Sequence, residues 1–379
     1  MSITGTGTQA DPYIVETYED LKTAVEYPCT DNLSYARYVE FKEKVSIDLS
    51  SEYPGQASPD ITVGVGIRTG NWNPKVHLSI DGKGSTISGY SSELPLFHIP
   101  YANRGDWYHT IDSATDTGYF ELKNITITKG YFPQSPIISV RSTPKLSNVS
   151  IDAMIENPDC LMFSIYQGKH TGYIKQCAFS FVKTIYDNSY NSGRLIPFSD
   201  KNNQLYWGNN NQQSSNHTWD SMSSNYGCYP IGRVPITDCK IDISSIVPVT
   251  FLTTASIGSS SNVVKSYFSR NTIILRGATR ILHFFVDGGN SNSTGNTSIA
   301  NCVIKGNSTG QIDLNFTNPA GSEISYAKLD GGVCVVDHTA LPNAAIQVPS
   351  GQNSPFKLLT AEEIKNPAYL RSIGFECGG

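Results

Sequence analysis

The chain has few charged side chains and no strong excess of either sign. Asp, Glu, Lys and Arg make up 16% of its 379 residues, and the formal net charge is -5. It therefore lacks the basic footprint of a nucleic-acid-binding protein, and we expect no nucleic-acid partner. It also lacks any apolar run approaching the roughly 18 residues that a membrane span requires, so we expect no membrane insertion.

Cysteines are present but do not have the spacing typical of metal sites. The eight cysteines stand at positions 29, 160, 177, 228, 239, 302, 334 and 377, and no C-x-x-C pair occurs among them. An even number could form four disulfides in a secreted protein. Three of them, however, recur at one position of a repeat, where a free thiol packs as a small apolar group. We therefore expect reduced structural thiols, no metal site and no cofactor.

The motifs of several enzyme classes are also missing. The sequence contains no G-x-S-x-G elbow, no H-E-x-x-H zinc motif and no phosphate loop ending in Gly-Lys-Ser/Thr. Its first residues show no basic region followed by an apolar stretch, so we expect no Sec signal peptide. Either the chain is made and assembled in the cytoplasm or its start has been trimmed, and the initiator-like Met1 favours the first alternative.

What the sequence does contain is a short repeated phrase. Residues 122–127 read LKNITI: an apolar residue, a spacer, a turn-forming amide, then two apolar residues one apart. The phrase returns, sometimes loosely, at 146–151, 174–179, 236–241, 268–273 and 299–304. Cys177, Cys239 and Cys302 take the position of Ile125 in it.

The distances between equivalent positions predict the architecture. Positions 124, 148 and 176 lie 24 and 28 residues apart, and positions 238, 270 and 301 lie 32 and 31 apart. Such periods indicate a solenoid or a propeller, and they are short for the four antiparallel strands of a propeller blade. We therefore predict coils of roughly three short parallel strands each, with the paired apolar positions stacked inside and the amide at a corner.

One interval is longer than the rest. Positions 176 and 238 are separated by 62 residues, which is either two periods or one coil with an insertion. Residues 186–229 are rich in aromatic rings and amides and have almost no aliphatic periodicity. This composition favours an insertion.

Helix signals occur near both ends of the chain. Thr17 and Asp20 have capping-box spacing, and Leu21 and Val25 follow on one helical face. Thr360 opens a second capping box in the run TAEE. We predict a short helix at each end.

Three segments resemble a known family. GTGTQADPYIVETYEDL (5–21) and LTAEEIKNPAYLRSIGF (359–375) resemble the terminal segments of bacterial surface and bacteriophage β-helix proteins. IDGKGSTISG (80–89) resembles an early coil of pectin-lyase-like right-handed β-helices. The resemblance implies an all-β, single-stranded right-handed parallel β-helix with short α-helical caps. We expect Gly82 and Gly84 to supply the positive φ of a tight turn in that coil.

The predicted organisation has three parts. An N-terminal cap covers 1–27, a parallel β-helix covers 28–345, and a C-terminal cap covers 346–379. Loop insertions are expected near 98–119 and 186–229.

Candidate catalytic residues come from two places. Polysaccharide lyases and hydrolases of the resembled fold use carboxylates and basic residues on the outer face of one sheet, but the hydrolase signatures N-T-D, D-D, G-H-G and R-I-K are missing. The carboxylates near the first insertion could form an acid/base pair or a calcium site. They lack the D-x-D-x-D-G order of a calcium loop, and a solvated loop is the competing interpretation. The sequence VVDH resembles the W-I-D-H of pectate lyases with Trp replaced, and it could equally be a turn after a strand. The candidates are Asp106, Asp112, Asp116, Glu121, Asp337 and His338.

Candidate binding residues are the aromatic side chains of the insertions. Rings stack on sugar faces, and the same rings are enriched in protein interfaces. The candidates are Trp107, Tyr186, Tyr190, Tyr206, Trp207, Trp219, Tyr226 and Tyr229.

Together these features favour a structural protein of a bacteriophage virion, in a capsid decoration, tail, fibre or spike. Its expected partners are other virion proteins or copies of itself, as in a homotrimer, and a bacterial surface glycan. One alternative is a tail-associated polysaccharide depolymerase, a lyase or glycoside hydrolase. Another is a bacterial surface adhesin or glycan-binding module, located at the cell surface.

Overall fold

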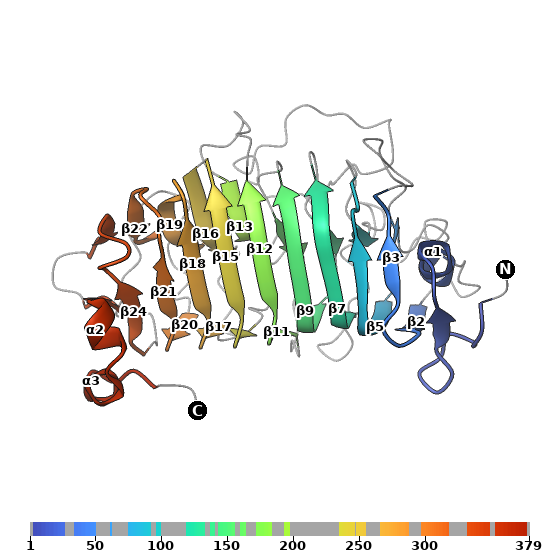
Figure 1. Ribbon diagram of the computed structural model, residues 1–379. Helices are drawn as coiled ribbons and strands as arrows, with labels where there is room; N and C mark the ends of the chain where they lie inside the picture. The colour runs from blue at the N-terminus through green and yellow to red at the C-terminus, as the bar shows by residue number, and fades with distance from the viewer. Residues whose placement is uncertain are drawn as a thin grey trace, which may run out of the picture.

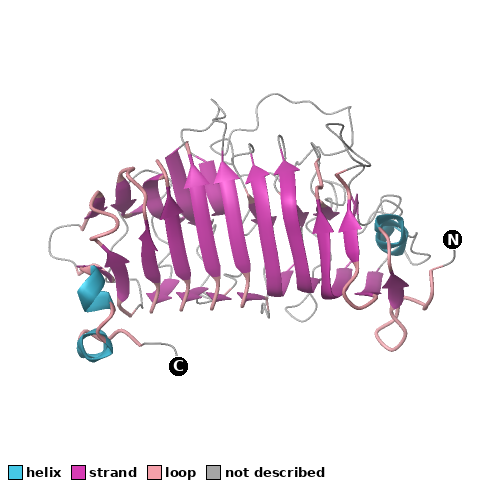
Figure 2. Ribbon diagram, in the orientation of Figure 1, coloured by secondary structure: helices cyan, strands magenta, loops and turns pink. Residues whose placement is uncertain are grey.

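The computed structural model describes seventeen stretches of the chain. They are residues 3–26, 34–50, 61–62, 75–91, 96–99, 119–132, 137–140, 143–155, 160–163, 172–183, 193–197, 235–246, 248–254, 266–287, 297–317, 332–348 and 353–376. Figure 1 shows their strands side by side along one elongated body, with the N-terminus at one end and the C-terminus near the other. Among the described residues strands dominate, and the helices lie at the two ends (Figure 2).

The largest sheet has sixteen strands drawn from the whole length of the chain. They are β1 (Tyr13–Val15), β2 (Ser34–Phe41), β3 (Ser46–Asp48), β5 (Lys75–Ser88), β7 (Tyr119–Phe132), β9 (Thr143–Ile155), β11 (Tyr173–Lys175), β12 (Ala178–Lys183), β14 (Ile236–Thr237), β15 (Lys240–Ser245), β17 (Ser266–Ser269), β18 (Thr272–Arg276), β20 (Thr297–Ala300), β21 (Val303–Gly306), β24 (Cys334–Asp337) and β26 (Phe356–Leu359).

Two smaller sheets lie alongside it. One has four strands: β4 (Ile61–Thr62), β6 (Phe97–Ile99), β8 (Ile138–Val140) and β10 (Leu161–Phe163). The other has six: β13 (Gly193–Pro197), β16 (Pro248–Thr254), β19 (Arg280–Asp287), β22 (Ile312–Leu314), β23 (Phe316–Thr317) and β25 (Ala344–Ile346). Strands pair in parallel with their counterparts one repeat away in all three sheets. The prediction of an all-β chain of parallel strands is therefore confirmed.

The repeated phrase sets the register of the large sheet. Its first apolar residue pairs with the equivalent residue of the next repeat, and these residues are buried. They are Leu122, Leu146, Ile174, Ile236, Phe268 and Ile299. Full burial of one such aliphatic side chain contributes about 1.5–3 kcal/mol, so each repeat adds its own increment to a core that runs along the molecule.

The long interval is one repeat with an insertion. Ile174 pairs directly with Ile236, so no further repeat lies between them in this sheet. β13 is the described part of the intervening segment, and it pairs with β16. This register fits the predicted insertion, which stays a prediction because most of 186–229 lies outside the described residues.

The third residue of the phrase turns the chain, and its backbone is in the left-handed conformation. The residues at this position have φ between 53° and 58°. They are Asn124, Asn148, Gln176, Asp238, Arg270 and Asn301. Amide and acidic side chains tolerate this region better than most, but Arg270 gains no such help, so the geometry of the stack imposes the conformation there.

The expectation for Gly82 was wrong. In this turn Lys83 and Gly84 have positive φ, at 49° and 78°, while Gly82 does not. A Cβ on Gly82 would lie 2.6 Å from both the carbonyl oxygen of Asn124 and the Cβ of Ile125. Gly82 is therefore needed for close approach to the neighbouring strand rather than for its dihedral angles.

The predicted helices cap both ends. In α1 (Tyr18–Glu26) the Asp20 amide donates to Thr17 Oγ1 at 3.1 Å, and the Thr17 amide donates to Asp20 Oδ2 at 3.0 Å. Leu21 and Val25 are buried. At the other end, α2 (Ala361–Ile364) has the expected capping box at Thr360, and α3 (Pro367–Ser372) follows directly.

Candidate functional site

Outward-facing polar and aromatic side chains gather on five neighbouring strands, β2, β5, β7, β9 and β11. In each strand the residue just before the buried apolar position faces outward, since side chains alternate along a strand. In register these residues are Tyr38, Ser79, Glu121, Lys145 and Tyr173. His77, Tyr119 and Lys175 lie two positions away on the same strands. We call these eight residues the tyrosine–lysine surface.

Glu121 lies at the centre of this surface. Ser79 Oγ donates to its Oε2 at 2.5 Å, and the Tyr173 hydroxyl donates to its Oε1 at 3.5 Å. The side chain is half-buried, and a carboxylate offers about four acceptor positions. Glu121 is thus held in place from two sides and can still accept hydrogen bonds from a ligand.

Two tyrosines meet beside Glu121. The hydroxyl oxygens of Tyr38 and Tyr119 lie 3.2 Å apart, and the His77 ring contacts the Tyr119 ring edge-on with centroids 4.7 Å apart. Burial raises the pKa of Tyr119, and the neighbouring Tyr38 and Glu121 raise it further. The Tyr119 phenol is therefore protonated at neutral pH. The bond between the two hydroxyls uses one hydroxyl hydrogen and leaves the second for another acceptor.

Two lysines lie over the tyrosine rings. Lys145 Nζ is 4.1 Å from the centroid of Tyr119, and Lys175 Nζ is 4.5 Å from that of Tyr173. Such cation–π contacts hold an ammonium group without neutralising it. Among the described residues, no ion pair involves Lys145 or Lys175. The surface therefore has two lysine side chains for one acidic side chain, Glu121.

The adjacent charges, in contrast, compensate one another. Asp81 carboxylate oxygen lies 3.6 Å from Lys83 Nζ and 3.7 Å from Lys123 Nζ, and Lys83 also pairs with Glu40 at 3.1 Å. Burial alone would raise the pKa of Asp81, but hydrogen bonds from Asn124 and the Lys83 amide, with both lysines nearby, leave it below its usual value. These residues form a structural ion cluster at the edge of the tyrosine–lysine surface.

The left-handed corners carry side-chain ladders with a structural role. Asn148 Nδ2 donates to Asn124 Oδ1 at 2.9 Å, and Asn124 Nδ2 donates to Asp81 Oδ1 at 3.0 Å. Near the C-terminus, Asn301 Nδ2 donates to Glu376 Oε2 at 3.2 Å. These contacts tie one repeat to the next and secure the C-terminal cap.

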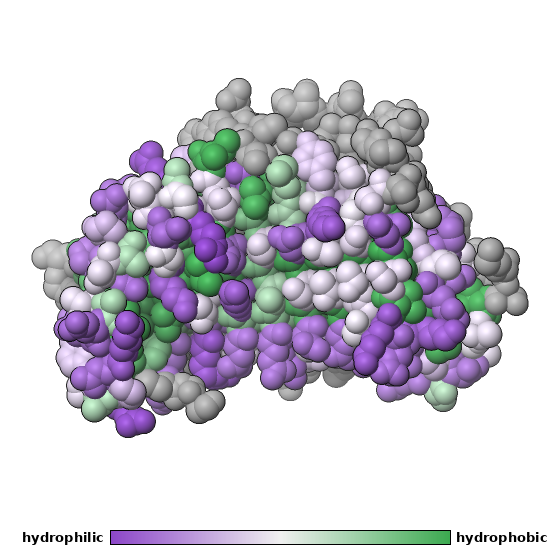
Figure 3. Space-filling view, in the orientation of Figure 1, coloured by the Kyte–Doolittle hydropathy of each residue, from purple (hydrophilic) through white to green (hydrophobic). Residues whose placement is uncertain are grey.

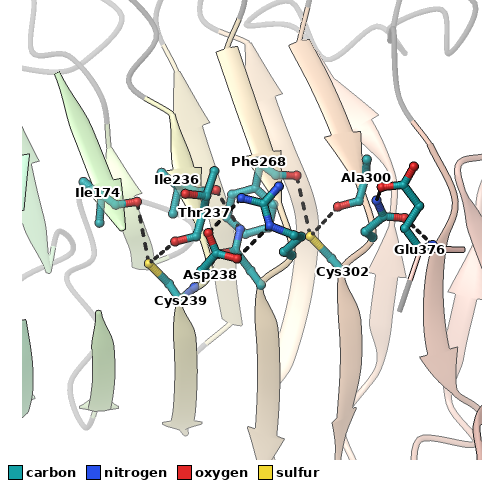
Figure 4. Close-up of polar contacts among 12 residues, drawn as sticks. Ile174, Ile236, Thr237, Asp238, Cys239, Phe268, Ala300, Cys302 and Glu376 are labelled. Carbon is teal, nitrogen blue, oxygen red and sulfur yellow. Dashed lines mark hydrogen bonds and ion pairs between the residues drawn. The ribbon is translucent and has the colours of Figure 1, made fainter. Parts of the chain in front are cut away.

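The cysteines of the repeat are buried thiols, as expected. Cys239 Sγ donates to the carbonyl oxygens of Ile174 and Thr237, and Cys302 Sγ to those of Phe268 and Ala300 (Figure 4). Burial raises the pKa of the Cys302 thiol. All five cysteines in the described part of the chain are buried thiols. Their burial in the core is consistent with a packing role.

The sheet face shown in Figure 3 is a second polar surface. Residues of intermediate hydropathy cover its centre, and hydrophilic ones gather along its lower edge. In the large sheet, Asp152 of β9 and Asp242 of β15 flank Ser180 of β12 in register. Asp242 is already bound by Arg276 through two hydrogen bonds of 2.6 and 2.7 Å, and Asp152 accepts from Thr128 at 3.4 Å. This engagement of Asp242 argues against an acid/base pair.

Of the predicted catalytic residues, Glu121 is the one that the structure places in a polar cluster. Asp337 ends β24 and accepts a hydrogen bond from the Ala340 amide at 3.1 Å, while His338 lies exposed in the following turn. The other predicted site residues lie outside the described residues. They are Asp106, Trp107, Asp112, Asp116, Tyr186, Tyr190, Tyr206, Trp207, Trp219, Tyr226 and Tyr229.

The sequence reasoning missed most of the tyrosine–lysine surface. Tyr38, Lys145 and Tyr173 each stand immediately before the first apolar position of a repeat, or of an equivalent strand. Superimposing the repeats on that position would have placed them in one row. The binding residues predicted from the sequence lie in the insertions instead.

Two findings on the described residues concern metal binding and membrane crossing. No group of three or more His, Cys, Asp or Glu side chains in this part of the chain could hold a metal ion. None of the described helices is both long and apolar enough to cross a bilayer.

Comparison with protein-family models, with curated proteins and with solved structures finds no match to this chain.

Proposed function

We propose that the chain is a structural protein of a bacteriophage particle, built as a single-stranded right-handed parallel β-helix and assembled in the host cytoplasm. It acts as a rigid element that contacts other particle proteins or copies of itself, and also a bacterial surface glycan. The observation that carries the proposal is the continuous parallel register from β1 to β26.

Stacked repeats suit a mechanical role because each repeat contacts mainly its neighbours, so stiffness extends along the whole stack. The two ends support this reading. An uncovered end strand would pair with other chains, and helices at the ends reduce that hazard. Here α1 packs near β1 and β2, and α2 packs near β24 and β26. The terminal segments resemble those of bacterial surface and bacteriophage β-helix proteins, which is compatible with a structural role.

The proposal is tested by following the chain into particles. Bacteriophage particles are purified from cells that carry an epitope-tagged copy of the gene, and the particles are labelled with gold-conjugated antibody. We expect the intact chain in the particles, with label at one fixed position. Recovery of the chain only from the cell surface or the medium contradicts the proposal and favours an adhesin.

Cleavage of a polysaccharide is a second candidate function, favoured by one observation. Glu121 is half-buried on an exposed sheet face, held by Ser79 and Tyr173, as a positioned acid or base would be. Capsular or pectic polysaccharides are incubated with the isolated chain and with a Glu121→Gln variant. New reducing ends or unsaturated uronides with the native chain alone support cleavage, and their absence with both rules it out for these substrates.

A further inference from the structure

We propose that the tyrosine–lysine surface is a binding site for a glycan chain that carries both hydroxyl and carboxylate groups. The inference rests on the glycan contact in the proposed function. It assigns that contact to strands of the large sheet rather than to the aromatic insertions. Its evidence is independent of any role in a particle.

Charge is the first argument. Lys145 and Lys175 have no carboxylate partner among the described residues, whereas the neighbouring Lys83 and Lys123 do. In a chain of net charge -5, two such ammonium groups on one surface mark a place for an anionic ligand. The tyrosine rings beneath hold both lysines in position. The lysine side chains therefore lose less conformational entropy when a ligand binds.

Hydrogen bonding is the second argument. Glu121 can accept from hydroxyl groups, and the Tyr38–Tyr119 pair has one hydroxyl hydrogen left to donate. Donors and acceptors that are fixed on one rigid surface match the mixed donor and acceptor character of sugar hydroxyls. A ligand with carboxylates alone would be repelled by Glu121, which lies on β7 in register with Lys145 on the neighbouring β9. Glu121 therefore favours an acidic glycan over an acidic peptide.

Geometry is the third argument. Tyr38, Ser79, Glu121, Lys145 and Tyr173 form one row across five parallel strands. Neighbouring strands lie about 4.8 Å apart, which is close to the length of one sugar unit. A polysaccharide that crosses the strands would thus present successive units to successive side chains. Ser79 and the half-buried tyrosines are fixed by packing, so the row is formed before binding.

Isothermal titration calorimetry of the isolated chain tests the site, with oligogalacturonate as the acidic probe and cello-oligosaccharide as the neutral one. We expect oligogalacturonate to bind more tightly, and its affinity to fall as salt is raised, because exposed charges are screened. The double variant Lys145→Gln/Lys175→Gln should bind at least about tenfold more weakly, the effect of losing two exposed charge contacts. The matched control is Lys240→Gln, an exposed lysine of β15 outside the surface, which should bind like the native chain.

Two further variants separate binding from folding. Tyr119→Phe keeps the ring under Lys145 and removes a hydroxyl, so we expect a two- to fivefold loss of affinity with an unchanged melting temperature. Glu121→Gln should weaken binding of both probes. Each variant is accepted for comparison only when its circular dichroism spectrum matches that of the native chain.

Several outcomes overturn the inference. These are no binding of oligogalacturonate by the native chain, equal loss of affinity in the Lys240→Gln control, or tighter binding of poly-glutamate than of oligogalacturonate. Failure here is distinguishable from failure of the proposed function. A chain that is found in particles but binds no glycan refutes this site alone, whereas a chain that binds but is absent from particles refutes the structural role alone.

Discussion

Arg270 binds Asp238 of the preceding repeat with two hydrogen bonds, from Nε to Oδ1 at 2.7 Å and from Nη2 to Oδ2 at 2.8 Å. Both residues occupy the left-handed corner, with φ of 56° and 58°. The ion pair therefore forms between two residues whose backbones are each in an unfavourable conformation. The ion pair therefore partly offsets the conformational free energy that the stacked repeats cost by holding both backbones at positive φ.

This relationship predicts an unusual order of stabilities at position 270. Arg270→Ala loses an exposed ion pair, worth about 0.2–1 kcal/mol, and keeps the backbone strain. Arg270→Gly loses the same pair but relieves roughly 1 kcal/mol of strain, because glycine adopts positive φ freely. We expect the glycine variant to be the more stable of the two by about 1 kcal/mol in urea unfolding.

Arg276 provides the matched control. It makes the same two-point contact with Asp242, but it lies in strand β18 and has no positive φ. There glycine should be less stable than alanine by about 0.5–1 kcal/mol, as in the interior of other strands. If alanine is more stable than glycine at both positions, the backbone conformation at the corner is not strained.

A second prediction concerns the position directly after the left-handed corner, which is Cys177, Cys239 or Cys302 in three other repeats. Asn271 occupies it after Arg270 and is buried; its Oδ1 accepts from the Cys239 amide at 2.9 Å and its Nδ2 donates to the Ile236 carbonyl at 2.9 Å. Asn271→Ala would leave two buried backbone groups without partners, at about 1–3 kcal/mol each. We expect a large fall in the urea midpoint with an unchanged m-value. Cys302→Ala is the control, since it removes only thiol contacts and should cost less.

The sequence predicted the repeat better than it predicted the surface. The spacing of positions 124, 148, 176, 238, 270 and 301 identified every left-handed corner of these repeats, because apolar stacking and turn formation leave a strong periodic pattern. Polar residues that face solvent are under no such constraint. Lys145 and Tyr173 differ in type although they occupy equivalent places, so only the register shows that they are neighbours.

The error at Gly82 has a related cause. Glycine in a turn suggests positive φ, but it serves equally where another backbone comes close. The sequence does not distinguish these roles, since the second depends on Asn124 and Ile125, which lie more than forty positions away in the chain. The resemblance to right-handed β-helices is likewise an expectation that the register supports only as far as parallel strands.

A third prediction concerns pH. The folded pKa of Asp81 lies below its usual value of 3.8, so its charged form stabilises the fold. For a lowered pKa this contribution is fully present above the unfolded value, and it is lost as the pH falls below about 3.8 through the folded value. We expect the melting temperature to drop between pH 5 and pH 3 in the native chain, and to drop less in Asp81→Asn. An equal drop in both would assign the acid sensitivity to other carboxylates.

The last prediction compares two glycines that both have positive φ. Gly306 has φ of 138°, and a Cβ added there would lie 2.0 Å from the carbonyl oxygen of Leu275 on the neighbouring strand. Gly84 has φ of 78°, but its added Cβ would meet nothing closer than Lys44 Cγ at 3.9 Å. Both alanine variants carry backbone strain of about 1–2 kcal/mol, and only Gly306→Ala must also move a strand.

We therefore expect Gly84→Ala to fold with a modest loss of stability, and Gly306→Ala to lose several times more or to be recovered only in inclusion bodies. Chemical unfolding monitored by tyrosine and tryptophan fluorescence measures the difference. Hydrogen exchange locates it, since opening in Gly306→Ala should begin at β18 and β21, which pair at this position. Similar losses in the two variants would mean that strain at positive φ, rather than the close approach of the strands, determines which residues the stack accepts.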